Sequence, residues 1–155
     1  MKSKLLALFL VALVVSCNRQ EDLKTKNSNN DVTSIGIVGS NGVHTITADQ
    51  DQLKATIALE NHMTKVDVLR VYTNEKNLTI LEARGPIKGG KYLTVAQVLT
   101  VKNGKTMRLI LGCKQSCTSI LPCNGCDLTI YSSQSGSCSC GSGGGGCTHT
   151  VECDS

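Results

Sequence analysis

The sequence predicts a mainly β protein, with a small antiparallel sheet or sandwich-like domain and a cysteine-rich, disulfide-stapled C-terminal module. Three observations lead to this fold class. Apolar and polar residues alternate with period two through much of 35–112, turn-forming residues separate the alternating runs, and eight of the nine cysteines lie between Cys113 and Cys153. One Phe, three Tyr and no Trp predict an aliphatic core.

The N-terminal segment predicts export. Lys2 and Lys4 precede an uninterrupted apolar run at 5–15. This run is too short for a transmembrane helix, which needs about 20 residues, and it has the arrangement of a signal peptide. We therefore expect segment 1–16 to be removed from the mature protein.

The residues Val14-Val15-Ser16-Cys17 resemble the lipobox of bacterial lipoproteins. The resemblance is confined to the N-terminal segment. It implies that Cys17 receives a diacylglyceryl group, becomes the first mature residue and often gains a further acyl chain such as palmitate. We expect a lipid-anchored protein of the cell envelope, on the outer membrane and facing the periplasm or the cell surface, because two or three acyl chains anchor a protein stably.

Residues 17–34 predict a flexible, lipidated tether, because they are polar and rich in Asn, Ser and Lys. Removal of Lys2 and Lys4 from the 16 basic residues leaves 14 against 12 acidic residues. This balance, together with the few aromatic residues, argues against nucleic acid as a partner. The membrane is the expected partner through the lipid, and the sequence does not identify a protein or small-molecule ligand.

Turn-forming residues divide the predicted antiparallel β domain, 35–112, into short strands. Asn103-Gly104 is the strongest hairpin signal, because both residues tolerate a positive φ angle. The Asn-Glu-Lys-Asn segment at 74–77 fits a four-residue hairpin loop. The expected strands cover 43–47, 66–73, 78–83, 92–101 and 106–111.

A further strand is predicted over 53–60. In this segment one set of residues, Leu53, Ala55, Ile57 and Leu59, alternates with Lys54, Thr56, Ala58 and Glu60. A helix over 49–63 is the alternative, since Ala, Leu, Lys and Glu all favour helices. Glu60 interrupts the apolar stripe of that helix, and we therefore favour the strand.

The segment 85–92 matches the G-x-x-x-x-G-K pattern of phosphate-binding loops, but Tyr92 stands where a Ser or Thr is required. A phosphate-binding loop opens a helix, whereas a strand-like run follows here. We interpret the segment as an exposed turn between strands and predict no nucleotide binding.

The C-terminal module, 113–155, cannot fold by burial alone, because it is rich in Gly and Ser and has few apolar residues. An even number of cysteines in an exported chain predicts four disulfides, with the pairing left open. Cys138 and Cys140 would share one face of a strand, so we expect each of them to pair with another cysteine rather than with one another. The full set is Cys113, Cys117, Cys123, Cys126, Cys138, Cys140, Cys147 and Cys153.

Metal binding is the alternative use of these cysteines. Cys117-x5-Cys123-x2-Cys126 resembles the first three ligands of one [2Fe–2S] ferredoxin class. Cys123 and Cys126 with Cys138 and Cys140 would supply four thiolates for zinc. Both patterns leave cysteines unexplained, and an oxidising compartment removes the thiolates that metals require, so we predict no metal and no cofactor.

Catalytic patterns are weak throughout the chain. His44, His62 and His149 are scattered, and neither a G-x-S-x-G elbow nor an H-E-x-x-H motif is present. Cys123 and Cys126 are interpreted as a structural turn rather than a thioredoxin-like pair, since strand-like residues follow them. We expect a non-enzymatic binding or structural component of the cell envelope, with a metal-binding protein and a toxin-like antibacterial effector as the alternatives.

Overall fold

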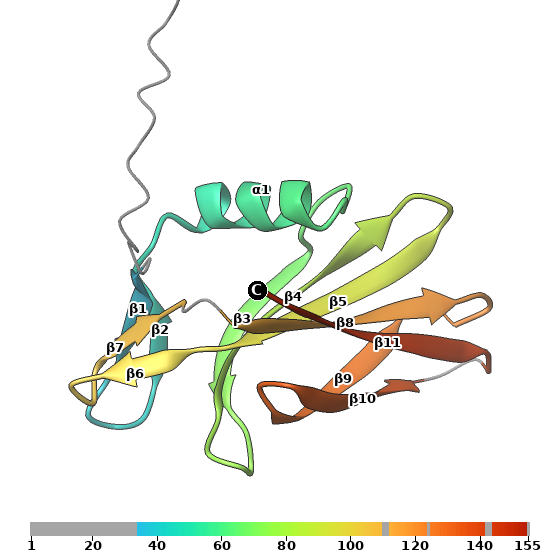
Figure 1. Cartoon of the computed structure of the whole chain (residues 1–155). Coiled ribbons are helices and arrows are strands. Elements are labelled where there is room, and N and C mark those ends of the chain that lie inside the picture. Colours follow the sequence, from blue (N-terminus) through green and yellow to red (C-terminus); the bar gives the residue numbers. More distant parts are fainter. Residues whose placement is uncertain (1–33, 110–111, 124, 142–143, 155) are drawn as a thin grey trace, which may run out of the picture. The chain divides into compact units, whose positions relative to one another are not determined.

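The computed structural model describes residues 34–109, 112–123, 125–141 and 144–154. The predicted signal peptide, Cys17 and nearly all of the predicted tether lie outside the described residues. The described residues confirm the mainly β fold class (Figure 1). In chain order the elements are β1 (Ser34–Val38), β2 (His44–Ile46), α1 (Gln50–Glu60), β3 (Val68–Thr73), β4 (Thr79–Ile87), β5 (Lys91–Val98), β6 (Thr100–Lys102), β7 (Thr106–Arg108), β8 (Cys113–Ile120), β9 (Cys126–Ser132), β10 (Ser135–Cys140) and β11 (Gly146–Cys153).

The largest sheet has five antiparallel strands in the order β11-β8-β5-β4-β3. A second sheet has the order β2-β1-β7-β6, and β9 and β10 form a separate hairpin. β8 pairs with β5 across the boundary that the sequence suggested between 112 and 113. The cysteine-rich segment therefore contributes β8 and β11 to the same sheet as the strands that precede it.

The two faces of the five-stranded sheet carry different cores, because neighbouring residues of a strand point to opposite faces. On β4, Leu81 and Ala83 belong to a cluster that includes Ile57 of α1. Ile80 directly precedes Leu81, and it belongs to a second cluster with Leu128 of β9. Figure 1 shows α1 above the sheet and the β9–β10 hairpin below it. The sheet is thus covered by a helix on one face and by a cysteine-rich hairpin on the other.

The strand predicted over 53–60 is wrong, and the alternative helix is correct, since these residues lie in α1. The side chain of Asp49 caps the helix by accepting hydrogen bonds from the backbone N–H groups of Asp51 and Gln52, both at 3.0 Å. Ile57 is buried, whereas Leu59 is 80% exposed. The period-two pattern therefore counted an exposed leucine as a core residue.

The Asn103-Gly104 hairpin is confirmed. Both residues have positive φ angles, 53° and 63°. The backbone N–H of Lys105 donates to the carbonyl oxygen of Lys102 at 3.1 Å, which closes the turn between β6 and β7. Two successive positive φ angles with this hydrogen bond define a type I′ turn, whose twist matches that of paired strands.

The segment that resembles a phosphate-binding loop is the β4–β5 hairpin. Gly89 and Gly90 form its exposed tip with φ angles of 83° and 73°. Gly85 lies within β4, where the carbonyl oxygen of Lys65 occupies the space that a Cβ atom would need. These glycines have structural explanations, and the interpretation of the segment as a turn is confirmed.

Candidate functional site

The helix α1 is held at both ends by backbone hydrogen bonds to strands. Before the helix, the N–H groups of Thr47 and Ala48 donate to the carbonyl oxygen of Ile35 in β1, at 3.0 and 3.1 Å. After the helix, Met63 forms an isolated bridge with Ile87 of β4, and its side chain is buried. These ties place α1 across one face of the sheet.

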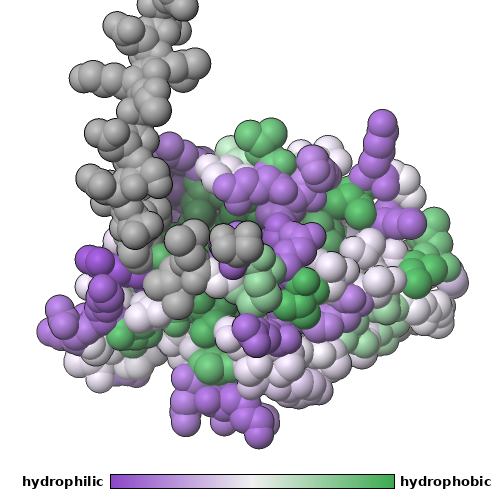
Figure 2. Space-filling model, in the orientation of Figure 1, coloured by the Kyte–Doolittle hydropathy of each residue, from purple (hydrophilic) through white to green (hydrophobic). Residues whose placement is uncertain are grey.

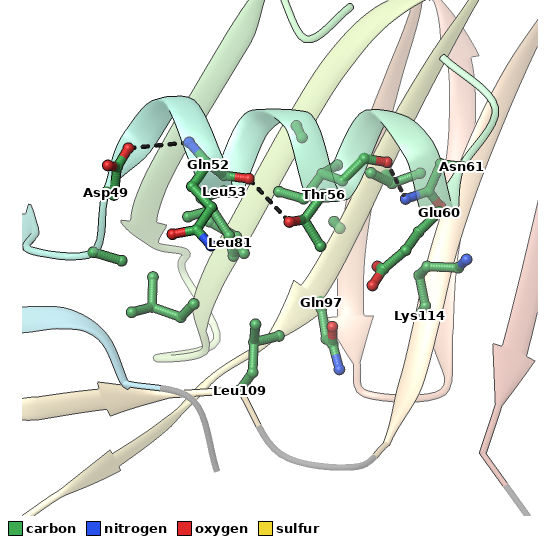
Figure 3. Close-up of a pocket in the computed structure, with 16 residues that line it drawn as sticks. Asp49, Gln52, Leu53, Thr56, Glu60, Asn61, Leu81, Gln97, Leu109 and Lys114 are labelled. Carbon is green, nitrogen blue, oxygen red and sulfur yellow. Dashed lines mark hydrogen bonds between the residues drawn. The ribbon is translucent and has the colours of Figure 1, made fainter. Parts of the chain in front are cut away.

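A cavity of about 390 Å³ lies between α1 and the strands beneath it. In Figure 3, α1 crosses the upper side of the cavity, and Leu109 and Gln97 lie opposite the helix. The apolar lining comes mainly from β1, α1, β4, β5 and the residue after β7, and includes Ile35, Leu53, Ile57, Leu81, Ala83, Val95 and Leu109. Segments far apart in the sequence thus build one apolar wall.

Polar and charged residues complete the lining of this cavity. The helix side contributes Asp49, Gln52, Thr56, Glu60 and Asn61, and the sheet side contributes Gln97 and Lys114. The ammonium group of Lys114 lies 3.0 Å from a carboxylate oxygen of Glu152. An apolar wall with polar groups from both sides suits a mainly apolar molecule that carries a polar end.

A charged cluster lies on the opposite face of the sheet, around Glu82, which is 2% exposed. Arg70 donates to its carboxylate through Nε at 3.1 Å and Nη2 at 3.0 Å, and the hydroxyl of Tyr72 donates at 3.1 Å. Burial and the adjacent carboxylate raise the pKa of Tyr72 to about 12. The hydrogen bond to Glu82 raises the pKa of Arg70. Because strong donors occupy the carboxylate, this cluster is a structural tie between β3 and β4.

The eight cysteines within the described residues form four disulfides, Cys113–Cys153, Cys117–Cys138, Cys123–Cys140 and Cys126–Cys147. The predicted disulfide-stapled module is therefore confirmed. As expected, Cys138 and Cys140 pair with different partners. Two disulfides, Cys117–Cys138 and Cys126–Cys147, join the β9–β10 hairpin to strands of the five-stranded sheet.

Comparison of the chain with protein families, curated proteins and solved structures finds no match. A functional interpretation therefore rests on the cavity and on the cysteines. The part of the chain that the structure describes contains no helix that is both long and apolar enough to cross a membrane.

The histidines do not meet in one site. His44 contacts the hydroxyl of Thr73 at 3.0 Å beside β3, and His149 contacts the side-chain oxygen of Gln115 at 3.1 Å from β11. β3 and β11 are the opposite edges of the five-stranded sheet. His62 is exposed and lies after α1. This separation gives no support to a catalytic histidine pair.

The Cys123 and Cys126 pair is placed as the sequence interpretation expected. The two cysteines bond to different partners, Cys140 and Cys147, and a strand, β9, begins at Cys126. A thioredoxin-like pair would instead lie at a helix N-terminus. The sequence did not predict the cavity, because the cavity depends on α1 and on strands that are distant in the chain. The local signal for α1 was Asp49, whose side chain caps the helix.

Proposed function

We propose that this protein is an exported lipoprotein, anchored to the cell envelope through Cys17, whose folded unit binds a small, mainly apolar molecule between α1 and the sheet. The cavity beneath α1 is the observation that carries the binding role. Its volume, about 390 Å³, falls within the range of roughly 300–1,000 Å³ that is common for small-molecule sites.

The chemistry of the lining favours an apolar ligand. Burial of about 200 Å² of ligand surface against these side chains would contribute about 5 kcal/mol at 25 cal/mol per Å². On the visible face that Figure 2 shows, green apolar patches are small and separated by purple polar residues. The cavity therefore offers a more continuous apolar surface than that face does.

The main support for the membrane anchor comes from the sequence. Val14-Val15-Ser16-Cys17 follows an apolar run that has signal-peptide length. Four disulfides are typical of an oxidising, exported environment, which agrees with that interpretation. A tethered binding unit would hold its ligand close to the membrane surface.

Two tryptophan variants of α1 test the binding site, because the natural chain has no Trp and each variant therefore carries a single Trp. Leu53 lines the cavity, and Leu59 is exposed on the same helix. Titration with dodecanoate, read by displacement of anilinonaphthalene sulfonate, should show saturable binding to the wild-type protein. We expect Leu53→Trp to weaken binding at least tenfold by filling the cavity, and Leu59→Trp to bind within twofold of wild type.

The Trp emission serves as the internal control for the two variants. It should be blue-shifted in Leu53→Trp and typical of exposed Trp in Leu59→Trp. Equal binding by both variants, or no saturable binding by the wild-type protein, would contradict the proposed ligand site.

A further inference from the structure

Four cysteine sulfur atoms gather on the face of the sheet that lies opposite the cavity. The Sγ atom of Cys117 lies within 4.8 Å of the Sγ atoms of Cys126 and Cys147, which form a disulfide with each other. The Sγ atom of Cys123 lies 3.8 Å from that of Cys147. These residues come from β8, from β11, and from β9 with the segment just before it, so three separate parts of the chain converge on one point.

We propose that reduction converts this cluster into a tetrathiolate site for a thiophilic divalent metal such as Zn²⁺, with Cys117, Cys123, Cys126 and Cys147 as the ligands. A tetrahedral zinc site with Zn–S bonds of about 2.3 Å has neighbouring sulfur atoms about 3.8 Å apart. The separation between Cys123 and Cys147 equals that edge, 3.8 Å. Cys117 lies within 4.8 Å of both Cys126 and Cys147. The sulfurs of Cys126 and Cys147 are bonded to each other in the oxidised form, and after reduction they have to separate to about 3.8 Å to complete the tetrahedron.

The surroundings of the cluster favour a closed, structural type of site. Cys117 and Cys123 are fully buried, and Cys126 is 1% exposed. Cys147 is half-buried on β11, an edge strand, and gives the metal an approach from solvent. Buried thiols resist ionisation in the absence of a cation, and a bound metal ion removes that cost by coordinating the thiolates.

The ligand set differs from the zinc pattern that the sequence suggested and contains the three cysteines of the ferredoxin pattern. The zinc pattern used Cys138 and Cys140, and these residues are the disulfide partners of Cys117 and Cys123. The ferredoxin pattern lacked a fourth ligand, and Cys147 fills that position. The role of Cys147 follows from the pairing of β8 with β11, because this pairing places Cys147 opposite Ser119, two residues from Cys117.

The change of state balances in electrons and protons. A dithiol or phosphine reductant opens Cys117–Cys138, Cys123–Cys140 and Cys126–Cys147, and each disulfide takes up two electrons and two protons. Zn²⁺ then displaces one proton from each of the four ligand thiols. The oxidised and metal-bound forms exclude each other, and in both forms the hairpin is fastened to the sheet, by sulfur–sulfur bonds or by one ion.

Anaerobic titration of the reduced, full mature chain with Co²⁺ tests the proposal. We expect one equivalent of Co²⁺ to produce thiolate-to-cobalt charge-transfer and tetrahedral ligand-field absorption, which one equivalent of Zn²⁺ abolishes. Cys126→Ser should weaken binding at least a hundredfold. The Cys113→Ser/Cys153→Ser variant is the matched control, since Cys113 lies four residues from Cys117 along β8, about 13 Å away, and it should bind within threefold of the unmodified chain.

Far-UV circular dichroism separates a built site from adventitious thiol binding. Metal should restore β structure to the reduced chain and should bind at least tenfold more weakly in denaturant. The proposal is overturned if no one-to-one tetrahedral complex forms, if the control variant loses as much affinity as Cys126→Ser, or if denaturant leaves the affinity unchanged. None of these outcomes depends on the apolar cavity, which the tryptophan variants test separately.

Discussion

At the scale of single residues, Glu82 shows how one buried charge organises two strands. Its carboxylate lies at 2% exposure, and a carboxylate in that position requires strong compensation. Arg70 supplies a two-nitrogen contact, and Tyr72 adds a hydroxyl donor from the same strand. The guanidinium of Arg70 also lies over the Tyr72 ring at 4.9 Å, so the two donors support each other.

Glu82→Gln should lower the free energy of unfolding by about 2 kcal/mol, because it removes the charge that Arg70 and Tyr72 compensate and leaves an amide with a poorer set of partners. Urea denaturation followed by circular dichroism measures the change. Glu152→Gln is the control, since Glu152 pairs with Lys114 at 3.0 Å but is 63% exposed, and we expect a loss below about 0.5 kcal/mol. Equal losses in the two variants would show that burial of Glu82 contributes nothing.

At the scale of elements, the sequence predicts what local chemistry decides. The Asn103-Gly104 turn depends on two φ angles and one hydrogen bond, and all three are local. α1 was harder to predict, because the alternation from Leu53 to Leu59 also fits a strand. Only the folded structure shows that Leu59 is exposed to solvent. The pairing of the cysteines was not predictable, since Cys126 and Cys147 meet only after β8, β9 and β11 have assembled.

Asp49 is the residue through which local sequence selects the helix. Its side chain satisfies two backbone N–H groups of the first turn. We expect Asp49→Ala to reduce stability by about 1 kcal/mol, because both donors would lose their partner. Asp51→Ala is the control in the same turn; it loses only a favourable charge near the helix N-terminus, worth roughly 0.3–0.5 kcal/mol.

Thermal and urea unfolding of the two variants measure this difference. A larger loss in Asp51→Ala than in Asp49→Ala would mean that the cap does not hold the helix. Because Asp49 also lines the cavity, dodecanoate titration of the capping variant would show how far ligand binding depends on an ordered start of α1.

At the scale of the whole molecule, the five-stranded sheet separates two chemistries. Residues of β4 and β5 alternate between the apolar face that α1 covers and the cysteine-rich face that β9 and β10 cover. A one-residue shift in the pairing of these strands would exchange the two faces. The disulfide from Cys113 to Cys153 fixes the β8–β11 end of the same sheet, so register and covalent staples reinforce each other.

Attachment to the membrane is the final property to test, because the proposed function places this folded unit beside a lipid surface. We expect mass spectrometry of the mature protein to find Cys17 as the first residue with covalently bound acyl chains, and fractionation to place the chain in a detergent-extractable membrane fraction. Two or three acyl chains hold a protein on a bilayer, since each buried methylene contributes about 0.8 kcal/mol. Cys17→Ala should carry no lipid and should either leave that fraction or keep its signal peptide.

The Cys113→Ser/Cys153→Ser variant is the matched control for this test, because it also removes cysteines but leaves the Val14-Val15-Ser16-Cys17 segment intact. It should remain lipidated and membrane-bound. A mature N-terminus other than Cys17, or a Cys17 without lipid, would overturn the anchor. The cavity and the sulfur cluster lie within 34–154, so the proposals for ligand binding and metal binding do not depend on the anchor.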